Sequence, residues 1–292
     1  MRTSKLMLTG ISYMLLAVFL MVCLDVVAKI LLKNYHVMQV TFLRGVISLL
    51  IIGGTGYLVR GKDSFKTQYW KWHILRTVLM TISSITFFVA LSLIPLVNCM
   101  VIVFISPIIV TALSGPFLGE TVGKWRWSAV LIGFVGILLI LQPTAGFIDL
   151  GTIYAFIAVV MYALLSLTSR KLANKETTYN LSFYMFIGPT FVGGVGSSFN
   201  WVVPTTEAWI LFILCGVIGG VGFIFINLTY QKAEASLLAS FEYTGLIWAS
   251  AAGYYLFAET IDVNIWLGAS IVILGGLIIL LRESGRLKSI KN

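Results

Sequence analysis

Residues 107–136 read PIIVTALSGPFLGETVGKWRWSAVLIGFVG, and residues 246–275 read LIWASAAGYYLFAETIDVNIWLGASIVILG. At a shift of 139 positions Glu120 falls on Glu259, and the threonine and tryptophan that follow each glutamate also match. Each stretch contains an apolar span, a glutamate–threonine turn, a tryptophan and a second apolar span with glycines. This self-similarity predicts that the chain consists of two copies of one unit.

The composition indicates a membrane protein. The chain has 292 residues, of which 59% are hydrophobic and only 11% are charged, whereas soluble domains carry about 25% charged residues. A transmembrane helix needs about 20 apolar residues, and several stretches of this chain are long enough. Stretches without any charged residue or histidine cover residues 77–119, 127–148, 177–206 and 208–231.

The apolar spans and the polar breaks between them predict an all-α fold with ten transmembrane helices. Short connections favour antiparallel neighbours. Arg2 and Lys5 precede the first span as in a signal peptide, but no small-residue cleavage site follows, so we expect a retained helix. The expected helices cover residues 7–32, 37–59, 72–94, 97–118, 125–142, 150–171, 180–201, 207–229, 235–257 and 263–282.

The basic residues predict the orientation of these helices. If the N-terminus lies in the cytoplasm, 17 of the 20 Lys and Arg residues fall on the cytoplasmic side, as the positive-inside rule requires. The outer connections carry Asp149, Glu207, Glu259 and Asp262 instead. Both termini are then cytoplasmic in a multi-pass protein of the inner membrane. Because this distribution explains the net charge of +9, we expect no nucleic-acid partner.

Ten spans in two copies give five spans per copy, and an odd number inserts the copies in opposite orientations. The copies are expected at residues 7–142 and 150–282, with a basic cytoplasmic tail at residues 283–292. Inverted repeats are typical of secondary transporters, which hold their substrate near the midplane between the repeats. The pattern therefore predicts transport by alternating access.

Several motifs resemble a known family. Residues 94–127, the matching residues 234–266 and FLRGVISLL at residues 42–50 are similar to the drug/metabolite transporter superfamily, in its EamA-like family. LTGI, DVVAK and HILR, which begin at residues 8, 25 and 73, look most like the bacterial S-adenosylmethionine uptake transporters of that family.

The resemblance implies two EamA-like units that form a ten-helix bundle around a central cavity, lined largely by helices 1, 3, 4, 6, 8 and 9. It implies a small polar metabolite as substrate, with S-adenosylmethionine uptake as the best match. Related members carry riboflavin, amino acids or carnitine, in either direction. We expect a monomer or a homodimer whose other partner is the lipid bilayer.

One position departs from the family pattern. Pro107 lies inside the fourth expected helix, and its match in the second copy is Leu246, where the family often has proline. For the second copy, the helix break that the family pattern implies at this position is therefore left open.

Glu242, next to Tyr243, is the sharpest functional candidate, because its nearest charged neighbour in sequence is Glu234, eight positions back. Intramembrane carboxylates usually face a cavity and mark substrate or ion sites. Glu242 is thus predicted to bind a proton, a cation or a cationic group of the substrate. The alternative is a protonated carboxyl that is hydrogen-bonded between helices.

Three further charges lie in the first two helices. Asp25 and Lys29 are four residues apart and share one helix face, where they form either an internal ion pair or a charged wall of the cavity. Arg44 holds a helix end or pairs with Asp25. His73 and Arg76 stand beside two tryptophans, so we expect them to anchor the third helix at the membrane interface.

Aromatic residues, among them Phe104 and Trp248, are candidates to stack on a substrate ring, although most aromatic residues in such a chain pack or face lipid. Glu120 and Glu259 occupy matching turns, which favours a shared structural role such as capping the next helix.

No Walker loop, zinc-binding histidine pair or activated nucleophile is present in the sequence, and the three cysteines show no paired spacing. We therefore expect neither an enzyme nor a cofactor or metal. Two other classes remain as alternatives. A lipid-modifying membrane enzyme would need a catalytic cluster, and a non-transporting scaffold would leave Glu242 unexplained.

Overall fold

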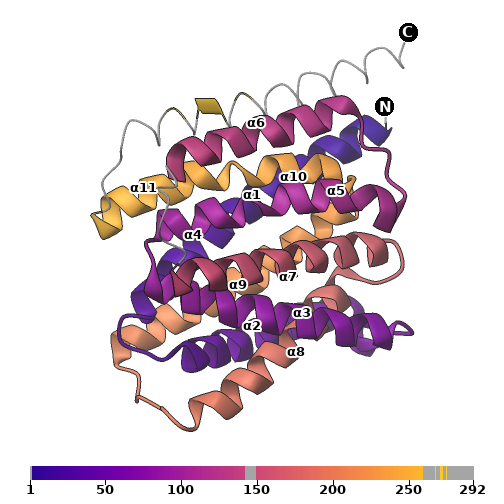
Figure 1. The fold of residues 1–292 in the computed structure, drawn as a ribbon. Coiled ribbons are helices and arrows are strands. Elements are labelled where there is room, and N and C mark those ends of the chain that lie inside the picture. The colour runs from indigo at the N-terminus through magenta and orange to yellow at the C-terminus, as the bar shows by residue number, and fades with distance from the viewer. Residues whose placement is uncertain (1, 142–148, 259–266, 268–269, 272–273, 275–292) are drawn as a thin grey trace.

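The computed structural model describes residues 2–141, 149–258, 267, 270–271 and 274. This part of the chain is all-helical, as expected, with helices lying side by side between α6 along one edge and α8 along the other (Figure 1). The elements are α1 (Arg2–Leu31), α2 (Val37–Arg60), the 3₁₀ helix η1 (Gly61–Phe65), α3 (Trp70–Leu93), α4 (Leu96–Val103), α5 (Ser106–Leu118), α6 (Lys124–Leu141), α7 (Leu150–Leu172), α8 (Thr178–Ser197), α9 (Thr206–Tyr230), α10 (Ala235–Glu242) and α11 (Gly245–Phe257).

Five helical segments in the described residues are long and apolar enough to cross a membrane. Most of the expected helices are found within a few residues of their expected bounds. The tenth, at residues 263–282, lies largely outside the described residues. The five segments are Met7–Leu31, Val37–Phe65, Trp70–Leu93, Leu150–Leu172 and Thr206–Tyr230.

Side-chain caps stand at the start of four helices of the described part of the chain. The His36 ring accepts the backbone N–H of Met38 at 3.3 Å, at the start of α2. Asp149 accepts a hydrogen bond from the backbone N–H of Thr152 at 2.6 Å, at the start of α7. Thr177 and Thr205 accept corresponding bonds at the starts of α8 and α9. Each cap satisfies a backbone donor that the first helical turn leaves without a partner.

Two expected helices are each broken in the middle. The fourth consists of α4 and α5, and the ninth consists of α10 and α11. At the shift of 139 positions read from the sequence, the bounds of α4 and α5 coincide with those of α10 and α11. The two copies therefore share their backbone geometry at this position.

The second copy is broken although Leu246 stands where the first copy has Pro107. In both breaks the backbone forms tighter i→i+3 hydrogen bonds, from Ile105 N to Ile102 O at 3.0 Å and from Thr244 N to Phe241 O at 3.2 Å. The Thr244 hydroxyl also donates to the Phe241 carbonyl at 2.7 Å. Local 3₁₀ bonding, which needs no proline, interrupts the α-helical ladder.

The main helix contacts are symmetric between the two copies: each contact remains when both helices are replaced by their counterparts in the other copy. α1 packs on α9 and α3 packs on α7, and exchanging the copies turns one pair into the other. The pair α2 and α8 maps onto itself, and the pair α4 and α11 maps onto α10 and α5. At the α2–α8 contact, a Cβ on Gly193 would lie 2.8 Å from the Phe42 backbone nitrogen, so glycine permits this close approach.

The connections between helices gather at two ends of the bundle. Residues 61–69, 119–123, 173–177 and 231–234, which we call the basic end, are joined by bonds such as that from Arg170 Nε to Glu120 Oε1 at 3.0 Å. At the opposite end, Gln39 exchanges two hydrogen bonds with the Val202 backbone, at 2.6 and 3.0 Å. The connections expected on the cytoplasmic side therefore lie together.

Candidate functional site

A cavity of about 140 Å³ lies inside the bundle. The helices that the family resemblance implied, which are α1, α3, α4, α7, α9, α10 and α11, all contribute to its wall, and α2 contributes Arg44 in addition. Most of the wall is apolar, with methionine, valine and phenylalanine side chains. Asp25, Arg44 and Glu242 bring charge to it, and Tyr162 brings a phenol.

Glu242 is the last residue of α10, so the break places its carboxyl at the cavity. The side chain is 7% exposed. Its Oε1 atom is buried and has no hydrogen-bond partner among the described residues, and the Ser106 hydroxyl lies near the carboxyl. A buried polar atom without a partner costs free energy that a bound ligand could recover.

Arg44 reaches the cavity from α2. Its Nη2 donates to Ser84 Oγ at 3.2 Å, and its guanidinium lies 5.0 and 5.4 Å from the ring centroids of Phe88 and Phe186. Its Nε is buried without a hydrogen-bond partner. Asp25 lines the same cavity and interacts electrostatically with Arg44, but the ion pairs of the described residues do not include one between them.

Lys29 lies away from this wall. Its ammonium group donates to the carbonyl oxygens of Ile94 at 2.9 Å and Leu91 at 3.4 Å, where α3 ends. A cation at a helix C-terminus is favourable, because the last carbonyl groups lack helical partners. The expected ion pair between Asp25 and Lys29 is likewise not among the ion pairs of the described residues.

The three aromatic candidates lie in different places. Phe104 lines the cavity, and the Tyr243 ring packs against it with 5.8 Å between centroids. The Tyr243 hydroxyl donates to the Val130 carbonyl at 3.3 Å and so connects this break to α6. Trp248 is 44% exposed and meets Phe19 edge-on at the surface of the bundle.

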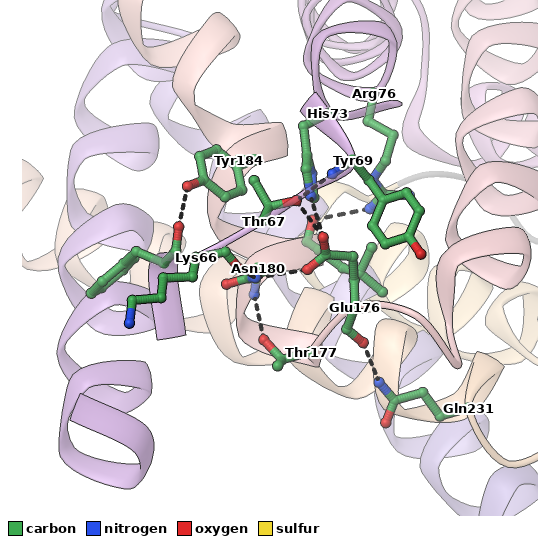
Figure 2. Close-up of polar contacts among 12 residues, drawn as sticks. Lys66, Thr67, Tyr69, His73, Arg76, Glu176, Thr177, Asn180, Tyr184 and Gln231 are labelled. Atoms are coloured by element: carbon green, nitrogen blue, oxygen red, sulfur yellow. Dashed lines mark hydrogen bonds and ion pairs between the residues drawn. The ribbon is translucent and has the colours of Figure 1, made fainter. Parts of the chain in front are cut away.

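The basic end contains a buried polar group that sequence reasoning missed. We call Thr67, His73, Glu176 and Asn180 the Glu176 cluster (Figure 2). The Glu176 carboxylate accepts hydrogen bonds from Thr67 Oγ1 and, at 2.7 Å, from Asn180 Nδ2, and His73 Nε2 lies 3.6 Å from it. Since Thr67 and His73 belong to the first copy, this cluster joins the two copies.

The expected interfacial anchoring of His73 and Arg76 was wrong, because both side chains are buried and Arg76 is 0% exposed. Arg76 donates to Ser169 Oγ at 2.6 Å, and to the Leu181 carbonyl at 3.0 Å. Its two terminal nitrogens are therefore hydrogen-bonded by α7 and α8 of the second copy, whereas its Nε has no partner among the described residues.

Glu120 holds helices together, in line with the structural role that its repetition in the sequence favoured. Its carboxylate pairs with Arg170 and accepts the backbone N–H of Ala235 at 3.1 Å, at the start of α10. Its described contacts thus connect the turn of the first copy to helices of the second copy. Glu259, its match, lies outside the described residues.

The model of the EamA-like transporter family matches residues 8–142 and 149–281. The S-adenosylmethionine uptake transporter of Rickettsia felis is 27% identical over 279 residues, which cover 96% of this chain and 95% of that protein. The riboflavin transporter of Vibrio cholerae is 30% identical over 215 residues, which cover 73% of this chain and 72% of that protein.

A solved crystal structure, whose description names no function, has a TM-score of 0.76 at 16% identity and covers 95% of this chain and 97% of its own. At this identity the likeness shows the fold alone. The family match extends over both copies and over nearly all described residues, so the chain belongs to the EamA-like transporter family.

Proposed function

We propose that this protein is a secondary active transporter that carries a small polar metabolite across the bacterial inner membrane by alternating access, with S-adenosylmethionine uptake as the most favoured activity. The family and the named relatives indicate a transporter rather than an enzyme. The observation that carries the proposal is the Glu242 carboxyl at a helix break on the wall of a central cavity. Broken helices at the midplane form the substrate sites of many transporters.

The proposed architecture has ten spans in two inverted repeats, residues 7–142 and 150–282, followed by a cytoplasmic tail at residues 283–292. The matched breaks and the exchange symmetry of the packing support two equivalent units. The basic end is proposed to face the cytoplasm, because its connections and the helix ends beside them carry most of the Lys and Arg of the described residues. Both termini then lie in the cytoplasm.

The proposed site consists of Glu242, Asp25, Arg44 and Phe104, which share the cavity wall. Glu242 would bind a cationic group of the substrate or a proton. The Tyr243 ring packs against the Phe104 ring, so we assign Tyr243 as a residue that positions Phe104 at the cavity. Lys29 and Trp248 lie elsewhere, and we assign them no contact with the substrate.

Riboflavin is the second candidate substrate, because a riboflavin transporter is 30% identical to this chain over 215 residues. A neutral, ring-rich molecule would use the aromatic wall and leave the charged groups unused. Competition between labelled S-adenosylmethionine and unlabelled riboflavin separates the two candidates.

The decisive experiment measures the uptake of labelled S-adenosylmethionine by bacterial cells that express the protein. We expect saturable uptake, and we expect Glu242→Gln to abolish it, because the substitution keeps the size of the side chain and removes its charge. Glu207→Gln is the matched control, since this carboxyl is exposed at the start of α9.

Normal uptake by Glu242→Gln would refute the role of this carboxyl. If the wild type reaches the membrane but takes up no S-adenosylmethionine, the substrate assignment is wrong, and a competition screen with riboflavin and amino acids follows.

A further inference from the structure

Two carboxyl groups and one guanidinium line a single cavity, and all three side chains are buried. Placing three ionisable groups in a mostly apolar chamber is costly unless each finds a partner. The described contacts leave part of this need unmet, because Arg44 Nε and Glu242 Oε1 both lack hydrogen-bond partners. The arrangement therefore points to a ligand with charges of its own.

The three charged groups reach the cavity from three helices. Asp25 comes from α1, Arg44 comes from α2, and Glu242 comes from the end of α10. Because the cavity holds two carboxyl groups and one guanidinium, it presents one mixed acidic and basic pair and one further, lone carboxyl. We take Glu242 as the lone carboxyl, since its Oε1 accepts no hydrogen bond from the described residues.

A mixed pair of this kind matches the head group of an α-amino acid. A guanidinium binds a carboxylate through strong, directional hydrogen bonds, and the carboxyl beside it can accept hydrogen bonds from the α-ammonium. The rings of Phe88 and Phe186 lie against the Arg44 guanidinium, and its Nη2 donates to Ser84 Oγ, so the group is held at the cavity wall. The lone carboxyl then has no counterpart in a simple zwitterion and needs a second cationic centre.

We propose that the cavity selects α-amino acids that carry an additional cationic centre, with Arg44 on the α-carboxylate, Asp25 on the α-ammonium and Glu242 on the added cation. This inference rests on the proposed function and deepens it. S-adenosylmethionine has this pattern, since its sulfonium is separated from its amino acid head by two methylene groups. Riboflavin and amino acids without the second cation lack it.

The test compares ligands that lack one charge each with variants that lack the matching partner. Purified protein in detergent is assayed for displacement of labelled S-adenosylmethionine by three unlabelled compounds. These are S-adenosylmethionine, S-adenosylhomocysteine, which lacks the positive sulfur, and decarboxylated S-adenosylmethionine, which lacks the carboxylate. The variants are Glu242→Gln and Arg44→Gln, with Glu207→Gln as the control.

In the wild type we expect S-adenosylmethionine to bind at least about tenfold more tightly than either analogue, because each analogue leaves a buried charge without its partner. Glu242→Gln should remove the preference over S-adenosylhomocysteine while it keeps the preference over the decarboxylated compound. Arg44→Gln should show the reverse, because a double-mutant cycle reports coupling between the two groups that are changed. Arg44→Lys, which keeps the charge, replaces Arg44→Gln if the latter does not fold, and should retain part of the preference.

Absence of any S-adenosylmethionine binding by the folded wild-type protein would overturn the proposed substrate. Binding with ratios that are the same in all variants would overturn the charge assignment alone. A smaller S-adenosylhomocysteine preference in Arg44→Gln than in Glu242→Gln would likewise show that the assignment of partners is wrong.

Discussion

The break between α4 and α5 and the break between α10 and α11 have the same backbone and different side chains. Their helix bounds match at a shift of 139 positions. The first break carries Val103 and Pro107, and the second carries Glu242 and Leu246 at the equivalent positions. The backbone geometry that forms the break is therefore common to both copies, whereas the side chains that the break presents are not.

The backbone break depends on local 3₁₀ hydrogen bonds that occur in both copies, so proline is not its cause. The carboxyl is present in one copy alone. Both copies have the same broken helix, but only the second copy has a carboxyl at the break, where Glu242 replaces the Val103 of the first copy. Under the proposed function, the substrate site therefore depends on a residue that differs between the copies.

The largest effect is expected when Glu242 is replaced by valine, the residue at the equivalent position of the first break. Loss of the carboxyl should lower the initial uptake rate at least about tenfold, which corresponds to about 1.4 kcal/mol of lost interaction. Uptake per amount of membrane-inserted protein is the measurement. A rate within twofold of the wild type would show that the two breaks are functionally alike.

A smaller effect is expected from Pro107→Ala, which removes the proline from the first break. Because the second break forms without proline, we expect the variant to keep its fold and its uptake, and to lose no more than about 1 kcal/mol of stability. Thermal unfolding in detergent and uptake are measured together. Loss of uptake as severe as in Glu242→Val would indicate that the first break, unlike the second, requires its proline.

The smallest effect is expected at the residues that end α5 and α11, which both adopt a left-handed backbone. Gly119 has a φ of 71° and Ala258 has a φ of 53°. Glycine adopts this conformation without steric cost, so Ala258→Gly should stabilise the protein by up to about 1 kcal/mol and Gly119→Ala should destabilise it by a similar amount. Equal signs for the two changes in melting temperature would contradict this explanation.

Much of this could be predicted from the sequence. The helices follow from apolar length, and the register of the copies follows from a few matched residues such as Glu120 and Glu259. Charged residues within apolar spans pointed to Asp25, Arg44 and Glu242, because burial of charge is rare enough to be informative. The structure places all three on one wall.

The failures have physical reasons. Arg76 stands beside tryptophans in the sequence, but its partners are hydroxyl and carbonyl groups about 90 to 105 positions away, which no local pattern reveals. In the sequence Glu176 looks like an ordinary loop carboxylate, because its partners Thr67 and His73 are more than 100 positions away. The second break could not be decided from the sequence, because the 3₁₀ turn at Thr244 depends on hydrogen bonds, which residue type alone does not specify.

The Glu176 cluster also affects the relative stability of the two conformations of the proposed transport cycle. Two inverted copies with identical side chains would make the inward-open and outward-open states equal in energy. The bonds of Glu176 and Arg76 join the copies at the basic end, and different bonds, such as those of Gln39, join them at the opposite end. In the proposed alternating-access cycle, this inequality would set the fraction of molecules that face each side, and the apparent affinity for substrate would scale with that fraction. Residues that never meet the substrate can therefore tune the concentration at which transport saturates.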